Sequence, residues 1–338
     1  MNPALHQQLH TAQLELHDLA AAVHHSPARA ELAAAIARRD AVLWSRAAGV
    51  SVDVAALAAL EADTTAPVEG TPAVAGSPTG AMAMRYLDAL EIGRSDPDAH
   101  LPGVELLHRM LSRLIARDRD DDGLATGRHA TLASVASERL LASVPGAGIV
   151  RAATTYRRLA PPGQTVVELT ALARLASALI LRPVDARPDD MALAPQLDYP
   201  AMEMDERGMV AEATGGDEPD RWLASFARSV SATVQRTREL VARLSALEDA
   251  DRVRIDALGK AAPSSHRVHR ALQRWPIASI ARMMDATGLQ VQAATSALHR
   301  LRGLGIIREI THRHRHRLYS YDGYVDIIAA DVDSWDGT

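Results

Sequence analysis

The chain of 338 residues contains no cysteine, which excludes disulfide bonds, thiolate metal sites and cysteine nucleophiles. It also has a single lysine (Lys260), a single phenylalanine (Phe226) and a single asparagine (Asn2). No apolar run reaches the roughly 18 residues that a membrane-spanning helix needs. The polar, helical N-terminal segment does not resemble a signal peptide, so we expect a cytoplasmic protein without a membrane partner.

Motifs that bind phosphate or build a nucleophile are missing as well. Neither GxGxxG nor GxxxxGK[ST] occurs, and no serine stands in a nucleophile-elbow context. The segment from Asp118 to Gly123 opens like a calcium loop, but His129 stands where the bidentate glutamate belongs. We interpret this segment as a solvated acidic loop and expect neither a metal nor a cofactor.

What the sequence does contain is helical periodicity. A hydrophobic content of 47% can bury two or three cores, and few β-branched alternations precede Ile306, so we expect a mainly α fold. Four regions are predicted: an N-terminal helical segment (1–80), a helical body (81–262), a C-terminal module (263–330) and an acidic tail (331–338). Helices are predicted at 3–24, 27–44, 52–62, 81–92, 103–117, 132–142, 149–158, 165–181, 202–213, 222–258 and 266–274.

The C-terminal module begins with two predicted helices. An apolar stripe at i, i+3, i+4 and i+7 indicates the first helix, formed by Ile277, Ile280, Ala281 and Met284. Gly288 follows where a tight turn needs a positive φ. The second helix is predicted from Gln290 to Arg302, and its buried stripe is formed by Ala294, Ala297, Leu298 and Leu301.

The chain then changes to a strand-like pattern. Strands are predicted at Ile306–Ile310 and Leu318–Tyr321, with a basic hairpin at 312–317 between them. Helix, turn, helix, strand, hairpin and strand together predict a winged helix-turn-helix, whose second helix fits the major groove of DNA.

Charge and residue type point to double-stranded DNA as the partner. Residues 263–324 carry a net charge of +7, whereas the whole chain carries −5. Such a basic region on an acidic protein is typical of a nucleic-acid site. The predicted DNA contacts are Gln290, Gln292, Ser296, His299, Arg300, Arg313, Arg315 and Arg317.

Histidines in this region have several interpretations. The hairpin histidines His312, His314 and His316 alternate with arginines and could converge on zinc or nickel, but phosphate contact by a hairpin is the favoured interpretation. If they act there, charging them at mildly acid pH strengthens DNA binding. His266 and His269 are predicted to lie on a solvated helix face.

The order of these segments resembles the Fic family, helical proteins that often carry a C-terminal winged helix. The likeness rests on the ending GLGIIREITHRHRHRLYSYDGYVDII (303–328), on GGDEPDRWLASFARSV (215–230) and on ARRDAVLWSRAAGVSVDVAAL (37–57). The last of these resembles the segment around the family's autoinhibitory motif. The resemblance implies a helical body with a nucleotide-transferring ancestry.

The family's diagnostic motif, His-Pro-Phe-x-Asp-Gly-Asn-Gly-Arg, is absent. When its final arginine is placed on Arg174, Val166 stands at the catalytic histidine, Thr170 at the acidic residue and 171–173 (Ala-Leu-Ala) at Gly-Asn-Gly. Ala48 stands where the inhibitory glutamate would be. Ala, Leu and Thr also allow a continuous helix where the enzymes have a phosphate-binding loop.

Three hypotheses follow. The first is a DNA-binding transcriptional regulator, a homodimer on a catalytically inactive Fic-like scaffold, with a small-molecule effector or a protein partner. The second is a diverged nucleotidyl- or phosphate-transferring enzyme in which Arg174 contacts phosphate and an acid such as Glu168 is the base. The third is a protein-interaction module of the toxin–antitoxin or phage type, whose winged helix contacts protein.

Overall fold

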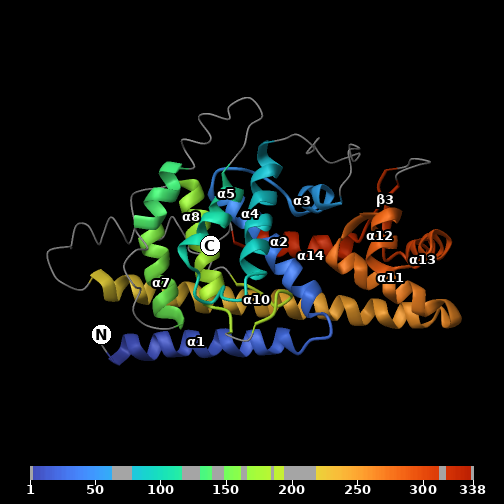
Figure 1. Ribbon diagram of the computed structural model, residues 1–338. Helices are drawn as coiled ribbons and strands as arrows, with labels where there is room; N and C mark the ends of the chain where they lie inside the picture. Colours follow the sequence, from blue (N-terminus) through green and yellow to red (C-terminus); the bar gives the residue numbers. More distant parts are fainter. Residues whose placement is uncertain are drawn as a thin grey trace. The chain divides into compact units, whose positions relative to one another are not determined.

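The computed structural model describes residues 3–62, 78–115, 130–138, 148–160, 166–183, 186–193, 218–311 and 317–335. Within them the chain is mainly helical, as its composition predicts, and carries one small sheet (Figure 1). The chain forms two compact units. Unit 1 comprises Met1–Ser26 and Arg85–Arg236, and unit 2 comprises Pro27–Met84 and Thr237–Thr338.

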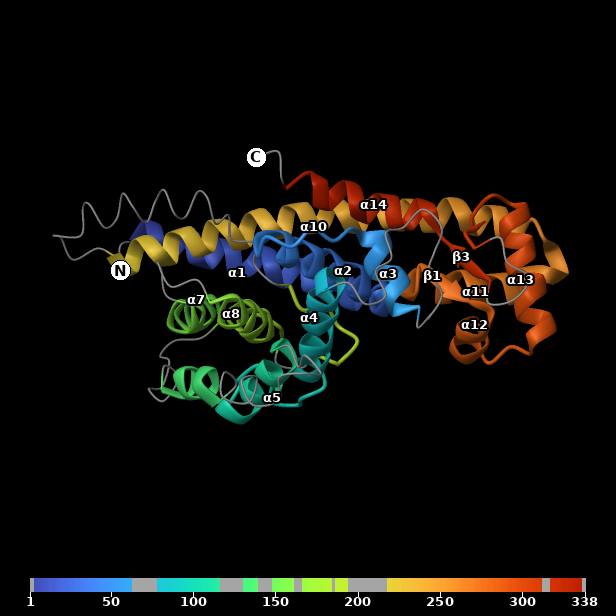
Figure 2. The same ribbon diagram turned by 90° about the horizontal axis from the view of Figure 1, so that it is seen from above.

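Among its described residues, unit 1 contains helices and connecting segments but no strand. The helices are α1 (Pro3–His24), the second part of α4 (Pro78–Arg94), α5 (Val104–Leu114), a helix at 130–138, α7 (Gly148–Leu159), α8 (Val167–Ile180) and the first part of α10 (Glu218–Asp256). The helix α8 packs against α7 and α5, and α7 packs against α1 (Figures 1 and 2).

The helix α8 lies at the centre of unit 1, and it has apolar residues on every side. Every residue from Leu169 to Ile180 is buried, and such a helix is stable only inside a core. Its neighbour α4 approaches closely at Gly93, where a Cβ atom would lie 2.6 Å from Leu179 Cδ1. An aromatic cluster of Tyr156, Trp222 and Phe226 closes the core, and the Trp222 indole donates a hydrogen bond to the Ala153 carbonyl (2.9 Å).

Unit 2 contains the small sheet. Its elements are α2 (Arg29–Ala47), α3 (Val54–Glu61), the first part of α4, the second part of α10, the 3-10 helix η1 (Gly259–Ala261), α11 (Ala262–Arg274), β1 (Ile277–Ser279), α12 (Ile280–Thr287), α13 (Val291–Gly303), β2 (Arg308–Glu309), β3 (Leu318–Ser320) and α14 (Asp322–Asp333). The helix α11 packs against α13, α2 and α12.

The three strands of unit 2 form an antiparallel sheet in the order β1-β3-β2. Ser320 lies opposite Ile277 on one side and opposite Arg308 on the other. Figures 1 and 2 both show α11, α12 and α13 gathered beside β3. A short hydrophobic cluster joins α3 to the sheet, formed by Ala58, Ala59, Ala62, Ile277, Ile310 and Leu318.

One element of this region differs from the sequence prediction. Ile277 was expected on the first helix, but it lies in β1, and the helix starts only at Ile280. The Ser279 side chain accepts a hydrogen bond from the Arg282 backbone N–H (3.2 Å) and so caps α12. Ile277 matches the apolar stripe of the helix only by its spacing. It lies in a strand because it pairs with β3, which follows about forty residues later.

The predicted apolar stripe of the first helix is also wrong, because Ala281 is exposed and Ile280 and Met284 are only half-buried, while Met283 and Thr287 are the buried residues of α12. The turn and the second helix agree with the sequence prediction. Gly288 ends α12 with φ 65°, the left-handed conformation expected of it. The helix α13 runs from Val291 to Gly303, one residue from the predicted bounds. Its predicted buried residues are each 0% exposed: Ala294, Ala297, Leu298 and Leu301.

The two units do not follow the predicted order of four consecutive regions along the chain. Residues 27–62 belong with the C-terminal module rather than with a separate N-terminal segment, because α2 and α3 pack on α11, α14 and β1. The Pro/Gly-rich stretch predicted at 64–80 gives way to α4 already at Pro78. The helix predicted at 202–213 lies outside the described residues. None of the helices in the described ranges is long and apolar enough to cross a membrane.

Candidate nucleic-acid interface

The helix α13 has two different faces. Its buried stripe of alanine and leucine packs on α11 and α12. On the other side Gln292, Ser296 and His299 are exposed, and they follow one another at i, i+4 and i+7. A helix with this spacing presents its polar residues along one strip. The structure therefore brings together three of the predicted DNA contacts.

The N-terminus of α13 adds further exposed groups to this strip. Gln290 is the N-cap residue, and its side chain makes no capping hydrogen bond. Val291, the first helical residue, is 53% exposed, although it lies three positions before the buried Ala294. Sequence reasoning missed Val291, because its spacing is that of a core residue.

Arg300 lies apart from this strip. It is only half-buried, and its guanidinium donates a hydrogen bond to the Ser264 hydroxyl of α11 (3.5 Å). The side chain thus leans toward the packing partner of α13. A DNA contact by Arg300 stays a prediction, and it requires the long side chain to leave Ser264.

The basic residues that flank α13 are partly neutralised by carboxylates. Glu309 of β2 receives Arg302 (3.0 Å) and Arg317 (3.5 Å) on its two oxygens, and Arg308 pairs with Asp322 (2.7 Å). These pairs are exposed enough for the guanidinium groups to exchange partners at small cost. The predicted contacts Arg313 and Arg315, and the three hairpin histidines, lie outside the described residues.

A buried polar network anchors α11 to α10 and to the end of β3. The Tyr321 hydroxyl donates to Asp251 (2.6 Å) and lies 3.0 Å from His269 Nε2, while Arg254 donates to the second oxygen of Asp251 (2.9 Å). His269 is 3% exposed, so its predicted place on a solvated face is wrong. The sequence could not show this, since its partner Tyr321 lies 52 residues away.

Electrostatics in this network favour the ionised carboxylate. Burial alone would raise the pKa of Asp251, but the hydrogen bonds from His269 and Tyr321 and the charges of His269 and Arg254 outweigh it, so the pKa lies below its ordinary value. Burial and the neighbouring carboxylate raise the pKa of Tyr321. Tyr321 therefore remains a hydrogen-bond donor, and the network holds α11 in a fixed position under α13.

His266, unlike His269, is partly accessible to solvent, closer to the predicted solvated helix face. It is half-buried, and its Nε2 lies 2.7 Å from the exposed Asp256. Among the described residues, no cluster of three His, Asp or Glu side chains is placed to hold a metal ion.

The residues of the enzyme hypothesis lie in the core of unit 1. Arg174 is 1% exposed in the middle of α8, and Glu168 is half-buried in the first turn of that helix. The helix runs unbroken through 170–174, as the Ala, Leu and Thr residues there predict. Ala48, at the position of the inhibitory glutamate, follows α2 in unit 2. A phosphate contact by Arg174 stays a prediction that needs an opening into the core.

No protein-family model matches the chain, and no curated protein is similar to it.

Proposed function

We propose that this protein binds double-stranded DNA through a winged helix-turn-helix, with α13 as the recognition helix, and that it regulates transcription. The observation that carries the proposal is the division of α13 into a buried Ala/Leu stripe and an exposed strip of Gln292, Ser296 and His299. A helix that is exposed to water and rich in hydrogen-bonding groups on one side suits the major groove.

The arrangement of the elements supports this proposal. A helix (α11), a strand, two helices joined by a glycine turn, and two further strands that pair antiparallel follow one another in that order. The second helix of such a pair enters the major groove in helix-turn-helix proteins, and its N-terminal residues contact base edges. Residues Gln290, Val291 and Gln292 stand at that N-terminus.

The residue types at this N-terminus favour adenine–thymine pairs. A glutamine side chain pairs bidentately with adenine N6 and N7, and an apolar side chain packs on the thymine 5-methyl group. The two glutamines flank the exposed Val291. We expect the preferred site to contain at least one A·T pair in register with Gln292 and Val291.

The hairpin after β2 supplies the sequence-independent part of binding. Arg313, Arg315 and Arg317 follow one another at alternate positions in the sequence, the spacing at which side chains share one side of a strand. Arginines in this arrangement suit phosphate oxygens, and such contacts position a protein on DNA without reading its sequence.

The helical body is proposed to be a Fic-like scaffold that does not transfer nucleotides. Support comes from α8, where the segment that would form the phosphate loop is a continuous buried helix. Phosphate loops present backbone N–H groups to the ligand, whereas a helix interior uses those groups in its own hydrogen bonds. The body is left with partner contact, dimer formation or effector sensing as its role.

Gel retardation of random and promoter DNA at low salt, including the promoter of the protein's own gene, tests this proposal. We expect retardation that weakens steeply as salt rises, because binding releases counterions from the phosphates. Absence of retardation for every fragment at low salt contradicts the proposal. Transfer of a nucleotide to any protein, abolished by a substitution in the helical body, contradicts its scaffold part.

A further inference from the structure

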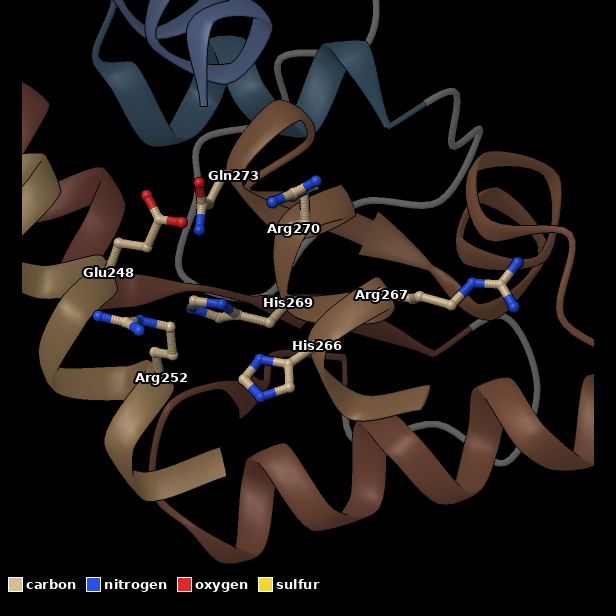
Figure 3. A pocket seen from close by; sticks show the side chains of 7 residues that line it. All are labelled: Glu248, Arg252, His266, Arg267, His269, Arg270 and Gln273. Carbon is tan, nitrogen blue, oxygen red and sulfur yellow. The ribbon is translucent and has the colours of Figure 1, made fainter. Parts of the chain in front are cut away.

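A cavity of about 380 Å³ lies in unit 2 between α10 and α11. Glu248 and Arg252 line it from α10, and the α11 side contributes His266, Arg267, His269, Arg270 and Gln273 (Figure 3). Its volume lies in the range of sites for small molecules. None of the proposed DNA contacts lines it.

The lining residues of α11 form one polar face. His266, His269, Arg270 and Gln273 follow at i, i+3, i+4 and i+7, the spacing at which helical side chains share a side. In Figure 3 both imidazole rings point toward α10, and the Gln273 amide lies near the Glu248 carboxylate, whereas Arg267 extends away from the other side chains. The Arg267 guanidinium donates to the Thr287 carbonyl and so has a structural role.

Gln273 is the residue that points most clearly to a ligand. The residue is 3% exposed and lines the cavity, and its amide, which forms no hydrogen bond to a described residue, keeps access to the open space there. Because these amide atoms reach the cavity without a partner in the protein, they can donate to and accept from a bound molecule. Arg270, one turn away on the same face, likewise has no hydrogen bond or ion pair to a described residue.

The charges around the cavity favour an anion. Three guanidinium groups line it against one carboxylate, Glu248, and a second carboxylate, Glu31 of α2, lies close enough to interact with the charges of Arg270 and Glu248. Two carboxylates beside it are already engaged, Asp249 with Arg252 (2.8 Å) and Asp256 with His266 (2.7 Å). What remains for a ligand is the Arg270 guanidinium and the Gln273 amide as donors, and the Glu248 carboxylate as an acceptor.

We propose that this cavity binds a small metabolite that carries a carboxylate or phosphate group next to a hydroxyl or amino group. Arg270 and Gln273 bind the anionic group, because a guanidinium donates two parallel hydrogen bonds to such oxygens. Glu248 accepts the hydrogen bond of the hydroxyl or amino group. An anion without such a donor leaves Glu248 as a repulsive neighbour and binds more weakly.

The position of the cavity allows a bound ligand to affect α13. His269 belongs both to the cavity wall and to the buried network with Asp251 and Tyr321. The helix α11 that bears it packs directly on α13. A ligand that shifts α11 therefore changes the surface on which the recognition helix α13 packs. This regulatory part rests on the proposed DNA binding, whereas the binding site itself does not.

Calorimetric titration of the full chain with three probes tests the binding site. Citrate and glucose 6-phosphate each combine an anionic group with hydroxyl groups, and inorganic phosphate serves as the simpler anion. We expect saturable binding of citrate or glucose 6-phosphate, tighter than that of inorganic phosphate. The relative affinity of the first two distinguishes a carboxylate from a phosphate ligand. No saturable binding of any probe up to about 10 mM overturns the proposal, because that limit lies far above the dissociation constants of specific sites.

Two variants show where the probe binds. Arg270→Gln changes an exposed residue and should fold normally, and Gln273→Leu removes the buried amide while keeping its volume. We expect each to weaken binding at least tenfold. Arg243→Gln, an exposed arginine on α10 outside the cavity, is the matched control and should bind as the parent chain does. Equal binding by all variants overturns the site.

A parallel titration of DNA binding with and without the probe separates the two proposals. A probe that binds by calorimetry and changes DNA affinity in the parent chain, but not in Arg270→Gln, supports both. A probe that binds while no DNA is bound under any condition supports the site and contradicts the proposed function. A probe that binds and leaves DNA affinity unchanged overturns the regulatory part alone.

Discussion

The helices α8 (14 residues) and α13 (13 residues) have similar lengths, but they differ in how much of their surface is buried. All twelve residues from Leu169 to Ile180 of α8 are buried, whereas the buried residues of α13 are the four of its stripe, Ala294, Ala297, Leu298 and Leu301. The difference lies in what separates the apolar residues. In α8 apolar residues occupy every side of the helix, with Thr170, Arg174 and Ser177 buried among them, whereas in α13 glutamine, serine and histidine recur on one side.

This comparison indicates where chemistry with a partner can take place. A side chain such as Arg174, buried in α8, can act only within the core, while Gln292 on α13 is in contact with water. The segment that the resemblance to Fic proteins assigns to nucleotide transfer is thus a structural helix, and the C-terminal module offers the accessible surface.

The largest expected effect is a loss of stability on substitution in α8, which we compare with a substitution in α13. Leu172→Ala in α8 removes a fully buried side chain and should lower the free energy of unfolding by about 3 kcal/mol. Ser296→Ala on the exposed strip of α13 should change it by less than about 0.5 kcal/mol. Urea unfolding followed by circular dichroism measures both, and equal losses would show that the two helices are not distinguished in this way.

A second prediction concerns the polar network that holds the module, in contrast to the apolar core around α8. Asp251→Ala leaves Tyr321 and His269 without their buried acceptor and should cost about 3 kcal/mol at neutral pH. Because the pKa of Asp251 is depressed in the folded protein, its stabilising contribution is complete above the ordinary carboxyl pKa of about 4 and disappears as pH falls through the lower value.

Urea unfolding of the parent chain and of Asp251→Ala at pH 7 and near pH 3 checks this prediction. The difference between them should shrink at the lower pH. Leu172→Ala is the control, since the loss it causes involves no titrating group and should persist. A difference for Asp251→Ala that is independent of pH would show that the carboxylate charge does not stabilise the module.

The third prediction separates the contacts to DNA phosphates, which position the protein, from the contacts to bases, which recognise the sequence. The double variant Arg313→Ala/Arg315→Ala should weaken binding to all sequences alike and reduce the slope of log affinity against log salt by about 2. Fluorescence anisotropy over a series of salt concentrations measures the slope. An unchanged slope would remove the hairpin from the interface.

The smallest effect is expected at Val291. Replacing thymine by uracil removes one methyl group and should weaken binding of a preferred site by about 1 kcal/mol, or roughly fivefold, if Val291 packs on it. In Val291→Ala the difference between thymine and uracil should vanish. A parent chain that binds the two DNAs equally would show that Val291 does not contact a methyl group in that site.

Local patterns in the sequence were sufficient to predict much of this structure. Apolar periodicity predicted α13 and its buried stripe, and Gly288 predicted the turn before it. The alanine and leucine residues of 169–180 predicted a continuous helix. These features depend on residues within a few positions of one another, where spacing determines which side chains share a face.

What the sequence could not predict depends on distant partners. The strand at Ile277 is stabilised by pairing with β3, and the burial of His269 depends on Tyr321 and Asp251. The packing of α3 on the sheet joins residues more than 200 positions apart in the chain. Val291 was missed for the opposite reason, because its spacing is that of the core stripe while its position at the helix end leaves it exposed.

The central claim is that the exposed strip of α13 reads DNA, and selection of bound sequences from a random duplex library tests it most directly. The parent chain should enrich a common site, and Gln292→Ala should still bind DNA but lose the preference at one adenine position, at a cost of about 1–3 kcal/mol there. An identical enriched site for both proteins would contradict the claim, and so would the absence of any enriched sequence with the parent chain.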